Sequence, residues 1–516
     1  MNHRFVFLIC SYNNEQWVRN NLDSVLCQTH DNWIVVYYNA ASTDKTYELV
    51  KEYADKDKRI HLYTTPERHM KTWFLQRLSE YETIQDNDIV CILDGDDFMA
   101  NEEVLYYLNE VYTKVNCWIT YGGMIVWNGG EETQEPYPQN TESPFEVKRD
   151  KLFRRDLWRY SHFRTYRGFL WNRIKKEDWL SNGEYVMIED LMTMYPCLEM
   201  CPTDKIFRID QTVYILNYSN ANGGSRGCTE NKINNIGQTQ EMEIRNRPKY
   251  SELSIVNPTF SGGLGNQMFE VAAAASLAKD NNAICLINPD EHSLPNQGRN
   301  IKTYLDNVFC QVVTDSAPPV KVEYQWDHIY YKPIPYQPNI KLIGHFNSFR
   351  YFDHNRDYIR QLFAPNAAVR NYINDKYGIS NLAKFTAIQV RRGDYVKFPA
   401  HHPLLPPKFT AKAVKLVNPE KALILSDDPK WCQENLHFTC PIEYVKEEDY
   451  IELYLMTFCK NVIISNSSFG WWGAYLNQVE GCQIISPPFW FGPAINNDGF
   501  KMDDMVPSTW IQLQYE

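Results

Sequence analysis

Short apolar runs alternate along this chain with stretches of helical period, and this alternation constrains its fold more than any other feature. The first hundred residues contain the runs "FVFLIC", "WIVVYYN", "IHLYTT" and "DIVCILD", and between them lie patterns such as "EQWVRNNLDSVLCQ" and "DKTYELVKEYADKD". Buried strands joined by helices form a parallel sheet covered by helices. We therefore expect an α/β fold whose ligands bind at the carboxyl ends of the strands.

The alternation is interrupted near the middle of the chain and then restarts. Residues 238–253 are polar and charged and include Pro248, as expected of a segment between domains. New strand patterns follow at "SIVNPTF", "AICLIN", "KLIGHF", "FTAIQV", "KALILS", "NVIIS" and "CQIIS". A chain of 516 residues is long enough for two or three domains. We predict domains over 1–245 and 255–516, joined by a linker over 246–254.

The composition excludes several classes of partner. The formal net charge of −12 disfavours binding to nucleic acid or to an anionic membrane surface. No apolar stretch approaches the ~18 residues needed to span a bilayer, and the apolar run near the start has no signal-peptide cleavage pattern. The 13 cysteines are scattered singly, which is typical of buried thiols in a reducing compartment. We expect a soluble, cytoplasmic protein, and its oligomeric state stays open.

Three carboxylates follow the fourth apolar run. In "CILDGDDFM", Asp94, Asp96 and Asp97 come at the end of a predicted buried strand, which directs them to the carboxyl edge of the sheet. Clustered carboxylates repel one another unless a cation neutralises them, and Mg²⁺ or Mn²⁺ prefers such oxygen ligands. A bound ion would also hold a diphosphate and stabilise it as a leaving group. The alternative interpretation is a solvated acidic turn.

The order of motifs in this first half resembles family 2 glycosyltransferases of the A-type fold, over roughly residues 4–225. The resemblance lies in "SYNNEQWVRNNLDSVLCQT", then "NAASTDKT", then "DGDD". It implies a Rossmann-like nucleotide-diphospho-sugar transferase domain with a nucleotide pocket and a metal bound by an Asp-x-Asp motif. By this resemblance the nucleotide-sugar residues are Ser11, Tyr12, Asn13, Asp44, Asp94 and Asp96, and the metal ligands are Asp94 and Asp96; Asn39 is added to the nucleotide pocket by its own chemistry.

The first half departs from that family at one point of the nucleotide pocket. Paired acids commonly precede the "STD" turn in the family, whereas this chain has Asn39 and Ala40. An amide both donates and accepts hydrogen bonds, so Asn39 is still able to contact the edge of a base. The identity of the base, and with it the nucleotide-sugar, stays open, with UDP as the default.

A glycosyl transfer also needs a base that deprotonates the acceptor hydroxyl. "YVMIEDLMTMYP" offers Glu189 and Asp190 within an apolar stretch, where partial burial raises the pKa of a carboxyl group. These acids could instead be stabilising the start of a helix. Family 2 enzymes have a Glu-Asp pair at this point of the chain, and the resemblance implies that Asp190 is the base of an inverting reaction, with Glu189 as second choice.

A glycine-rich loop opens the second half. In "GGLGNQMF" the glycines, which include Gly263 and Gly265, permit tight turning and close approach of a ligand to the backbone. The helix that follows directs its N-terminus at the loop, which favours an anion. The motif lacks both the Lys-Ser/Thr of a phosphate-binding loop and the third glycine of a dinucleotide fingerprint. A purely structural turn is the alternative.

Three further predicted strands end in polar residues at the same kind of edge. "TAIQVRRGDYV" places Arg391 and Arg392 there, and guanidinium groups suit bidentate binding of a diphosphate. "LILSDDPKW" adds Asp427 and Asp428, and "VIISNSSFGWWGAYL" adds a run of serines. Because ligands of parallel sheets bind at these ends, we expect the segments to form one site.

These segments, with "IGHFNSFRYF", closely resemble family 11 glycosyltransferases, the α-1,2-fucosyltransferases, over roughly 255–490. The resemblance implies a B-type fold of two Rossmann-like lobes and a metal-independent, inverting transfer of L-fucose from GDP-fucose to a 2-hydroxyl, usually of galactose. By this resemblance the GDP-fucose-binding residues are Gly263, Gly265, Asn266, Gln267, Arg391, Arg392, Asp427, Asp428, Ser467 and Ser468. The arginine pair serves the diphosphate, with Arg392 preferred as the catalytic group. For the base two alternatives stay open: Asp394, or no base and assistance to the leaving group alone.

The second half departs from its family as well. The motif around the arginines normally begins with His, and this chain has Gln389 there. Glutamine cannot titrate near neutral pH as histidine does. A loss of activity therefore follows if the family's histidine transfers a proton, but not if it only donates or accepts a hydrogen bond.

The sequence thus predicts a bifunctional glycosyltransferase. We expect the first half to transfer a hexose from an unidentified nucleotide-sugar with Mg²⁺ or Mn²⁺, and the second half to add fucose to the same growing glycan. Fusion would raise the local concentration of the intermediate. In the alternative, only the fucosyltransferase half is active and the first half is a glycan- or nucleotide-binding module, an interpretation supported by Asn39 and Ala40 at altered motif positions. Gln389 keeps open an inactive second half in the same way.

Overall fold

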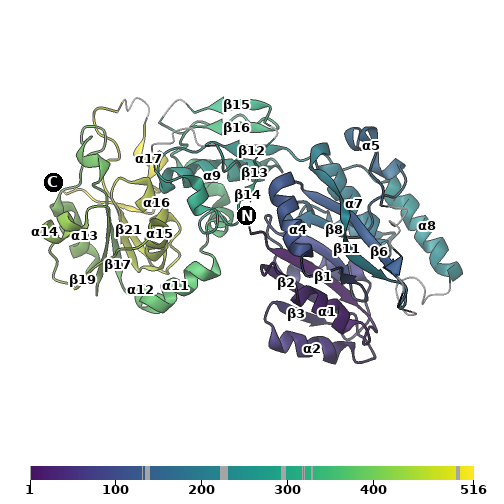
Figure 1. Cartoon of the computed structure of the whole chain (residues 1–516). Coiled ribbons are helices and arrows are strands. Elements are labelled where there is room, and N and C mark those ends of the chain that lie inside the picture. The colour runs from purple at the N-terminus through teal and green to yellow at the C-terminus, as the bar shows by residue number, and fades with distance from the viewer. Residues whose placement is uncertain are drawn as a thin grey trace. The chain divides into compact units, whose positions relative to one another are not determined.

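The chain divides into two compact units, Met1–Leu253 and Ser254–Glu516. The computed structural model describes residues 2–130, 132–133, 140–220, 230–291, 298–316, 318, 320–326, 329–495 and 500–515. Both units alternate strands with helices, as the sequence predicts (Figure 1). The predicted linker, 246–254, spans the division between the units, and the precise ends of the two domains stay a proposal.

A mixed sheet forms the centre of the N-terminal unit. Within the described residues it has nine strands in the order β3-β2-β1-β4-β8-β6-β11-β5, with β7 paired to β6. Strands β1 to β4 run parallel, whereas β8 runs antiparallel to β4 and to β6. The strands are β1 (Phe5–Ser11), β2 (Trp33–Asn39), β3 (Ile60–Thr64), β4 (Ile89–Asp94), β5 (Phe98–Met99), β6 (Ile119–Trp127), β7 (Glu132–Thr133), β8 (Arg164–Arg167) and β11 (Ile206–Asn217), with a separate hairpin of β9 (Leu180–Ser181) and β10 (Glu184–Tyr185).

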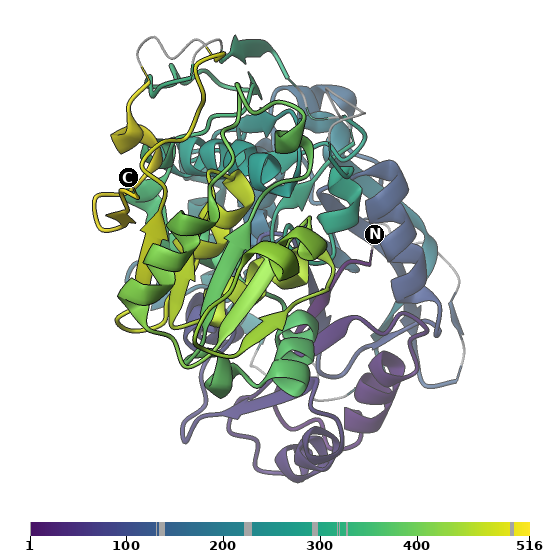
Figure 2. The same ribbon diagram turned by 90° about the vertical axis from the view of Figure 1, so that its left-hand side faces the viewer.

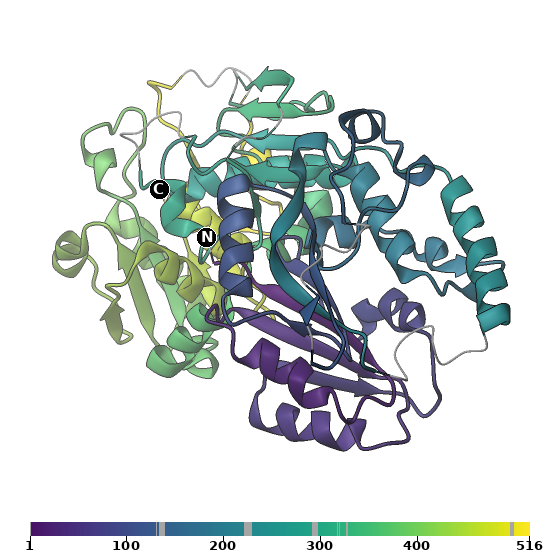
Figure 3. The same ribbon diagram turned by 45° about the vertical axis from the view of Figure 1, so that its right-hand side comes forward.

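The helices of this unit cover the sheet because the strands are apolar on both faces. Alternate side chains of β1, including Phe5, Phe7 and Ile9, are buried in one core with apolar residues of α1 and α4. Helices α1 and α2 lie side by side (Figure 3). The helices are α1 (Val18–Leu26), α2 (Thr46–Lys56), α3 (Lys71–Gln76), α4 (Val104–Glu110), α5 (Phe145–Arg149), α6 (Gly168–Trp171), α7 (Glu189–Met200) and α8 (Glu230–Asn246).

The C-terminal unit consists of two lobes, each built on a parallel sheet. In the described residues the first sheet has the order β14-β13-β12-β16-β15 and the second has the order β19-β18-β17-β20-β21-β22. The first lobe contains β12 (Ile255–Pro258), α9 (Leu264–Asp280), β13 (Ile284–Ile287), β14 (Val313–Thr314), β15 (Val322–Gln325) and β16 (Ile340–Ile343), followed by α10 (Arg356–Leu362), α11 (Ala367–Tyr377) and α12 (Ile379–Leu382).

The second lobe has helices on both faces of its sheet (Figure 2, green to yellow). Side chains of α13 and α14 pack on one face, and those of α15 and α16 pack on the other. The elements are β17 (Thr386–Val390), α13 (Pro407–Val417), β18 (Ala422–Ser426), α14 (Pro429–Asn435), β19 (Ile442–Tyr444), α15 (Asp449–Phe458), β20 (Asn461–Ile463), α16 (Ser468–Tyr475), β21 (Gln483–Ser486), α17 (Met502–Met505) and β22 (Ile511–Gln512).

The two lobes meet where α9 packs against α16. Phe269 of α9 contacts Trp471 and Trp472, with ring centroids 4.6 and 5.1 Å apart, in a core that includes the buried alanines of α9. Trp472 Nε1 donates a hydrogen bond to the carbonyl of Gly265 over 3.0 Å. A side chain at Gly265 would overlap the peptide between Ser468 and Phe469. The glycine is therefore required for this close packing of backbone on backbone.

We predict that Gly265→Ala lowers the free energy of unfolding of the C-terminal unit by about 3 kcal/mol, because two backbones must move apart to admit the methyl group. Urea unfolding of the full chain, with hydrogen exchange assigning the loss to α9 and α16, measures the effect. Gly263→Ala is the matched control, since a Cβ there meets no atom within 4 Å. Equal stability of the two variants would contradict the packing argument.

Candidate functional site

The register of the N-terminal sheet brings the predicted nucleotide residues to one edge. Ser11 at the end of β1 lies beside Asn39 at the end of β2, and Cys10 lies beside Asp94 at the end of β4. The loops after β1 and β2 are joined by hydrogen bonds. Asn13 Oδ1 accepts from the Thr43 amide over 2.8 Å, and its backbone is left-handed at φ 53°. The sheet therefore places these residues together where a ligand of a parallel sheet binds.

Two other predicted residues shape the same loops. Asp44 accepts hydrogen bonds from the amides of Glu15 and Thr46, each over 3.0 Å, and so joins the loop after β2 to the loop after β1. The ring of Tyr12 lies under the guanidinium group of Arg68, 3.7 Å from the ring centroid. The structure thus gives Asp44 a direct part in loop geometry, and its predicted contact with a nucleotide stays a prediction.

The three carboxylates of the "DGDD" turn have different partners. Asp97 is buried and accepts from Tyr214 Oη over 2.6 Å and from the Asn217 amide over 2.8 Å, so it supports the turn. Asp94 Oδ1 accepts from Lys71 Nζ over 2.6 Å. Asp96 accepts from the Asn220 amide group over 2.8 Å, while burial and the charge of Asp94 raise its pKa. No described basic side chain lies within 4.0 Å of the Asp96 or Asp97 carboxylate, and Asp97 is already held by Tyr214 and Asn217.

The donor set fits a divalent ion bound through Asp96. In the described part of the chain no group of three or more His, Cys, Asp or Glu side chains forms a ready-made metal site. Mg²⁺ commonly uses one or two carboxylates together with the phosphate oxygens of its substrate. The carboxylate of Asp94 already pairs with Lys71. Of the two predicted metal ligands, Asp96 is therefore better placed to bind an ion, and the ion itself stays a prediction.

A buried ionic cluster continues from Asp94 to the start of α7. Lys71 Nζ lies 3.1 Å from Glu189 Oε2, and Arg164 lies 3.2 Å from Glu189 and 2.8 Å from Asp190. Although burial opposes it, the charges of Arg164 and Lys71 lower the pKa of Glu189 to about 2. Partial desolvation raises the pKa of Asp190, and Arg164 opposes this. The side chain of Glu189 is 5% exposed and that of Asp190 is 45% exposed.

Glu189 is therefore a fixed anion, whereas Asp190 has the exposure and the raised pKa that suit proton transfer. The sequence analysis missed the basic members of the cluster. Lys71 stands at the start of a short helix, and Arg164 lies in an internal strand, where a charged residue has no motif of its own. Strand β8 has the sequence Arg-Thr-Tyr-Arg and carries no apolar pattern, so no signal in the sequence marks Arg164.

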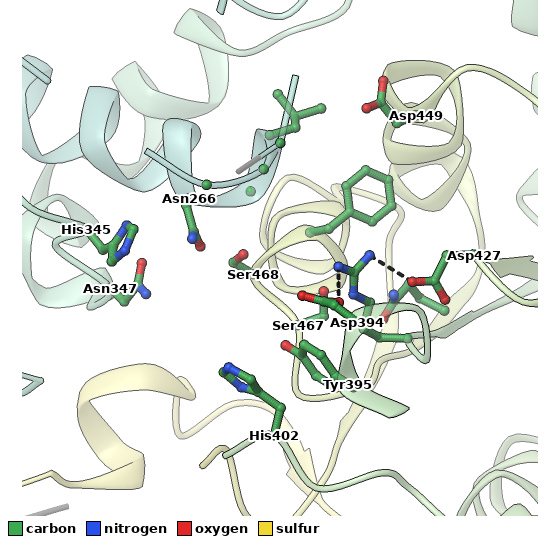
Figure 4. A pocket seen from close by; sticks show the side chains of 18 of the residues that line it. Asn266, His345, Asn347, Asp394, Tyr395, His402, Asp427, Asp449, Ser467 and Ser468 are labelled. Carbon is green, nitrogen blue, oxygen red and sulfur yellow. Dashed lines mark hydrogen bonds and ion pairs between the residues drawn. The ribbon is translucent and has the colours of Figure 1, made fainter. Parts of the chain in front are cut away.

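A cavity of about 1210 Å³ lies between the lobes of the C-terminal unit. The loop before α9 forms one wall, and the segments that follow β17, β18 and β20 form another (Figure 4). Eight of the predicted site residues line it: Gly263, Gly265, Asn266, Arg391, Asp394, Asp427, Ser467 and Ser468. The structure thus brings the glycine loop and the three strand ends together around one cavity, as the sequence predicts.

The two arginines of this site point in different directions. Arg391 lines the cavity and lies 2.6 Å from Asp394 and 2.8 Å from Asp427. Arg392 pairs with Asp428 over 3.0 Å and covers the ring of Trp431 at 3.8 Å. Neither Arg392 nor Asp428 lines the cavity. The geometry favours Arg391 over the preferred Arg392 for a ligand held there.

Two glutamines near the cavity have structural partners. Gln267 is fully buried and donates to the carbonyls of Gly262 and Arg299, so it holds the glycine loop rather than lining the cavity. Gln389 does line it, and its Oε1 accepts from the Ser465 amide over 3.2 Å. Gln389 therefore fixes the loop after β20 by hydrogen bonding.

Other residues of the cavity were missed by the sequence analysis. His345 and Asn347 follow β16, and Glu447, Asp449 and Glu452 lie at the start of α15 and just before it. Burial raises the pKa of Glu452 to about 7. Both segments follow the carboxyl ends of parallel strands, and this position in the sequence could have identified them as candidates for the site.

Both units have polar loops gathered at the carboxyl edge of parallel strands, which is the arrangement of α/β enzymes that bind nucleotides. The model of glycosyl transferase family 11 matches residues 239–513, more than half of the chain, and the model of glycosyl transferase family 2 matches residues 6–174. The chain belongs to glycosyl transferase family 11 and carries a family 2 domain before it. The predicted fusion of the two families and the predicted α/β fold class are confirmed.

Curated relatives match about half of this chain. The O-antigen biosynthesis glycosyltransferase WbnK of Escherichia coli is 30% identical over 49% of this chain and 98% of its own length. An alpha-1,2-colitosyltransferase of Escherichia coli is 24% identical over 51% of this chain and all of its own length. A galactoside 2-alpha-L-fucosyltransferase of Caenorhabditis elegans is 22% identical over 51% of this chain and 81% of its own length.

Among solved structures, Staphylococcus aureus TarS 1-349 is 20% identical with a TM-score of 0.32, over 42% of this chain and 60% of that one. This chain thus spans less than two thirds of that structure. The fucosyltransferase NodZ of Bradyrhizobium is 12% identical with a TM-score of 0.33, over 43% of this chain and 92% of that one. The fold assignment rests on the strand topology and the family matches, because scores near 0.3 do not define a shared fold.

The families confirm an enzyme that takes a nucleotide-sugar donor and a glycan acceptor. Across the described residues, every helix is too short or too polar to traverse a bilayer.

We predict that Arg164→Met lowers the free energy of unfolding of the N-terminal unit by about 3 kcal/mol, because it leaves the buried Glu189 carboxylate with less compensating charge. Urea unfolding of the full chain measures the loss, and hydrogen exchange of β8 and α7 locates it. Lys51→Met is the control, since Lys51 forms an exposed ion pair with Asp55 along one helix and such pairs contribute at most about 1 kcal/mol. An equal effect of both variants would contradict the role given to the buried cluster.

Proposed function

We propose that the C-terminal unit transfers L-fucose from GDP-fucose to the 2-hydroxyl of a galactose-like acceptor, with inversion to an α-1,2 linkage. The observation that carries this proposal is the 1210 Å³ cavity, where the glycine loop, Arg391 and two serines meet in a chain of family 11. Relatives named as galactoside 2-alpha-L-fucosyltransferases support the sugar and the linkage. One relative is named a colitosyltransferase, so colitose is the second candidate sugar for the same cavity.

The proposed diphosphate site combines a helix terminus with one arginine. Backbone amides and the dipole at the start of α9 attract an anion. Arg391 lines the cavity beside the segments after β17 and β18 and already has two carboxylate partners. Asp427 also accepts from the Arg392 amide over 2.8 Å, which fixes it in the loop, whereas Asp394 is 58% exposed. A diphosphate would therefore replace Asp394 on Arg391.

For the N-terminal unit we propose inverting transfer of a hexose from a nucleotide-sugar. Asp190 would accept the proton of the acceptor hydroxyl, and Arg164 would hold its carboxylate in place. Asp96 would hold Mg²⁺ or Mn²⁺, which neutralises a diphosphate leaving group when bound. Ser11, Asn13 and Asn39 border the proposed nucleotide pocket.

The two activities are proposed to act in sequence, with the fucose added to the sugar that the first unit transfers. The competing proposal keeps the N-terminal unit as a binding module. It is favoured by the Lys71–Asp94 ion pair, which neutralises one carboxylate of the predicted metal pair. A product analysis with UDP-sugars and GDP-fucose together separates these proposals, because only the sequential one places fucose on the newly added residue.

We predict that Arg391→Ala weakens GDP binding about 10²-fold, since it removes charge-assisted hydrogen bonds worth roughly 1.5–3 kcal/mol each. Arg392→Ala is expected to weaken it less than about threefold, because Arg392 points to Asp428 and Trp431. Isothermal titration calorimetry with GDP measures both. Arg370→Ala, at an exposed position outside the cavity, is the control. A larger loss of GDP affinity in Arg392→Ala than in Arg391→Ala would contradict this assignment and favour Arg392 as the residue that binds the diphosphate.

We predict that Asp96→Ala and removal of divalent ions by EDTA each abolish hexose transfer and leave fucose transfer unchanged. The physical reason is that only the N-terminal site is proposed to neutralise its leaving group with a metal. Radiolabelled transfer from UDP-sugars and from GDP-fucose measures the two reactions separately. Loss of fucose transfer to an added galactoside acceptor in Asp96→Ala would show that the two sites are coupled.

A further inference from the structure

A carboxylate is buried beside the glycine loop without any part in the diphosphate site. Glu270 of α9 is 1% exposed at its side chain, and its Oε1 accepts from Ser261 Oγ over 2.7 Å. The imidazole Nδ1 of His345 lies 3.2 Å from the same Oε1 and 3.0 Å from Ser261 Oγ. Burial raises the pKa of Glu270, while its bonds with His345 and Ser261 oppose this. Ser261, Glu270 and His345 thus form one hydrogen-bonded group.

The backbone after β16 is shaped so that His345 reaches both this group and the cavity. Phe346 has a left-handed backbone at φ 47°, which is costly for a bulky residue. Its ring is fully buried against Trp326 and Tyr351, which holds the chain in that conformation. The residues on either side, His345 and Asn347, both line the cavity. Strain of this kind is maintained at functional sites when the surrounding packing enforces it.

His345 and Asn347 leave polar atoms available to a ligand. Because Nδ1 faces Glu270 and Ser261, the second ring nitrogen, Nε2, is left with no hydrogen-bond partner among the described residues. Asn347 Oδ1 is buried and likewise has no partner in the described part of the chain. Figure 4 shows His345, Asn347 and Asn266 on one side of the pocket and Asp394 and Asp427 on the other. The histidine therefore faces the cavity at a distance from the arginine cluster.

We propose that His345 is the general base of the transfer in the C-terminal unit, with Glu270 as its positioning residue. This inference rests on the proposed fucosyl transfer. His345 Nε2 takes the proton of the acceptor hydroxyl while the oxygen of that hydroxyl forms a bond to C1 of the donor sugar. The bond between C1 and the phosphate oxygen breaks, and GDP leaves with the electron pair. Glu270 stabilises the imidazolium through Nδ1–H, and the imidazolium then releases its proton to water.

Other candidates for the base have different partners. The carboxylate of Asp394 lies 2.6 Å from Arg391, in the cluster that would bind phosphate. His402 also lines the cavity, but its ring stacks on Tyr395 with centroids 4.5 Å apart, and no described carboxylate lies within 4.0 Å of it. A histidine whose other nitrogen bonds a carboxylate has a fixed tautomer and a more basic free nitrogen. Only His345 among the cavity's described histidines has this arrangement.

The test compares four variants of the full chain: His345→Ala, Glu270→Gln, His402→Ala and His354→Ala. His354 is the matched control, because it pairs with Asp280 over 2.7 Å on the surface, outside the cavity. We measure fucose transfer from GDP-fucose to a free galactoside, with and without added imidazole, and binding of GDP by calorimetry. Removal of a general base lowers kcat about 10²- to 10⁴-fold, and GDP affinity should change less than about threefold because the donor is held elsewhere.

Imidazole should restore part of the kcat of His345→Ala, since it replaces the missing base. Glu270→Gln, which keeps the size of the side chain and an acceptor for Ser261, should lower kcat about 10²-fold by removing the counter-charge. Transfer by His345→Ala at the wild-type rate, or loss and imidazole rescue confined to His402→Ala, would overturn the inference. If the wild-type chain binds no GDP and transfers no fucose, the proposed function itself is wrong, and the inference falls with it.

Discussion

The contact between Gly265 and the start of α16 is the constraint on which the C-terminal site depends. Because Gly265 has no side chain, the first turn of α9 rests directly on the Ser468–Phe469 peptide, and Trp472 donates to its carbonyl. This contact joins the glycine loop of one lobe to the serines of the other. The proposed anion site is therefore built from both lobes, and it depends on the contact between their backbones.

The alternation of apolar runs with helical stretches was enough to predict the class of fold and the sheet edge at which the candidate site residues gather. The parallel register then determines which of these residues are neighbours: Ser11 and Asn39 end adjacent strands and lie side by side. The sequence could not decide between Arg391 and Arg392. Both follow the last residue of β17, so the strand's alternation of side chains between its two faces does not tell which arginine faces the cavity. Arg392 pairs instead with Asp428 in the loop after β18, which the sequence pattern does not reveal.

The buried charges could not be predicted for a related reason. Glu270 stands in an alanine-rich helix, and its partner His345 lies 75 residues further along the chain. Lys71 and Glu189 are even further apart in sequence and meet only in the folded unit. No local pattern encodes such pairs, because a helix position is buried or exposed according to what packs on it. The burial of Glu270 requires the first lobe to be complete.

The two sites are proposed to neutralise a diphosphate by different means. The N-terminal edge gathers Asp94, Asp96, Glu189 and Asp190 around two basic side chains, Lys71 and Arg164, so its excess is negative and calls for a cation. Carboxylates also line the C-terminal cavity, but there the proposed diphosphate would be met by a helix terminus and Arg391 rather than by a metal ion. Each proposed base is nevertheless held by a buried charged partner, Asp190 by Arg164 and His345 by Glu270. Since a buried partner is screened little by solvent, it holds the base in place at little further entropic cost when the acceptor binds.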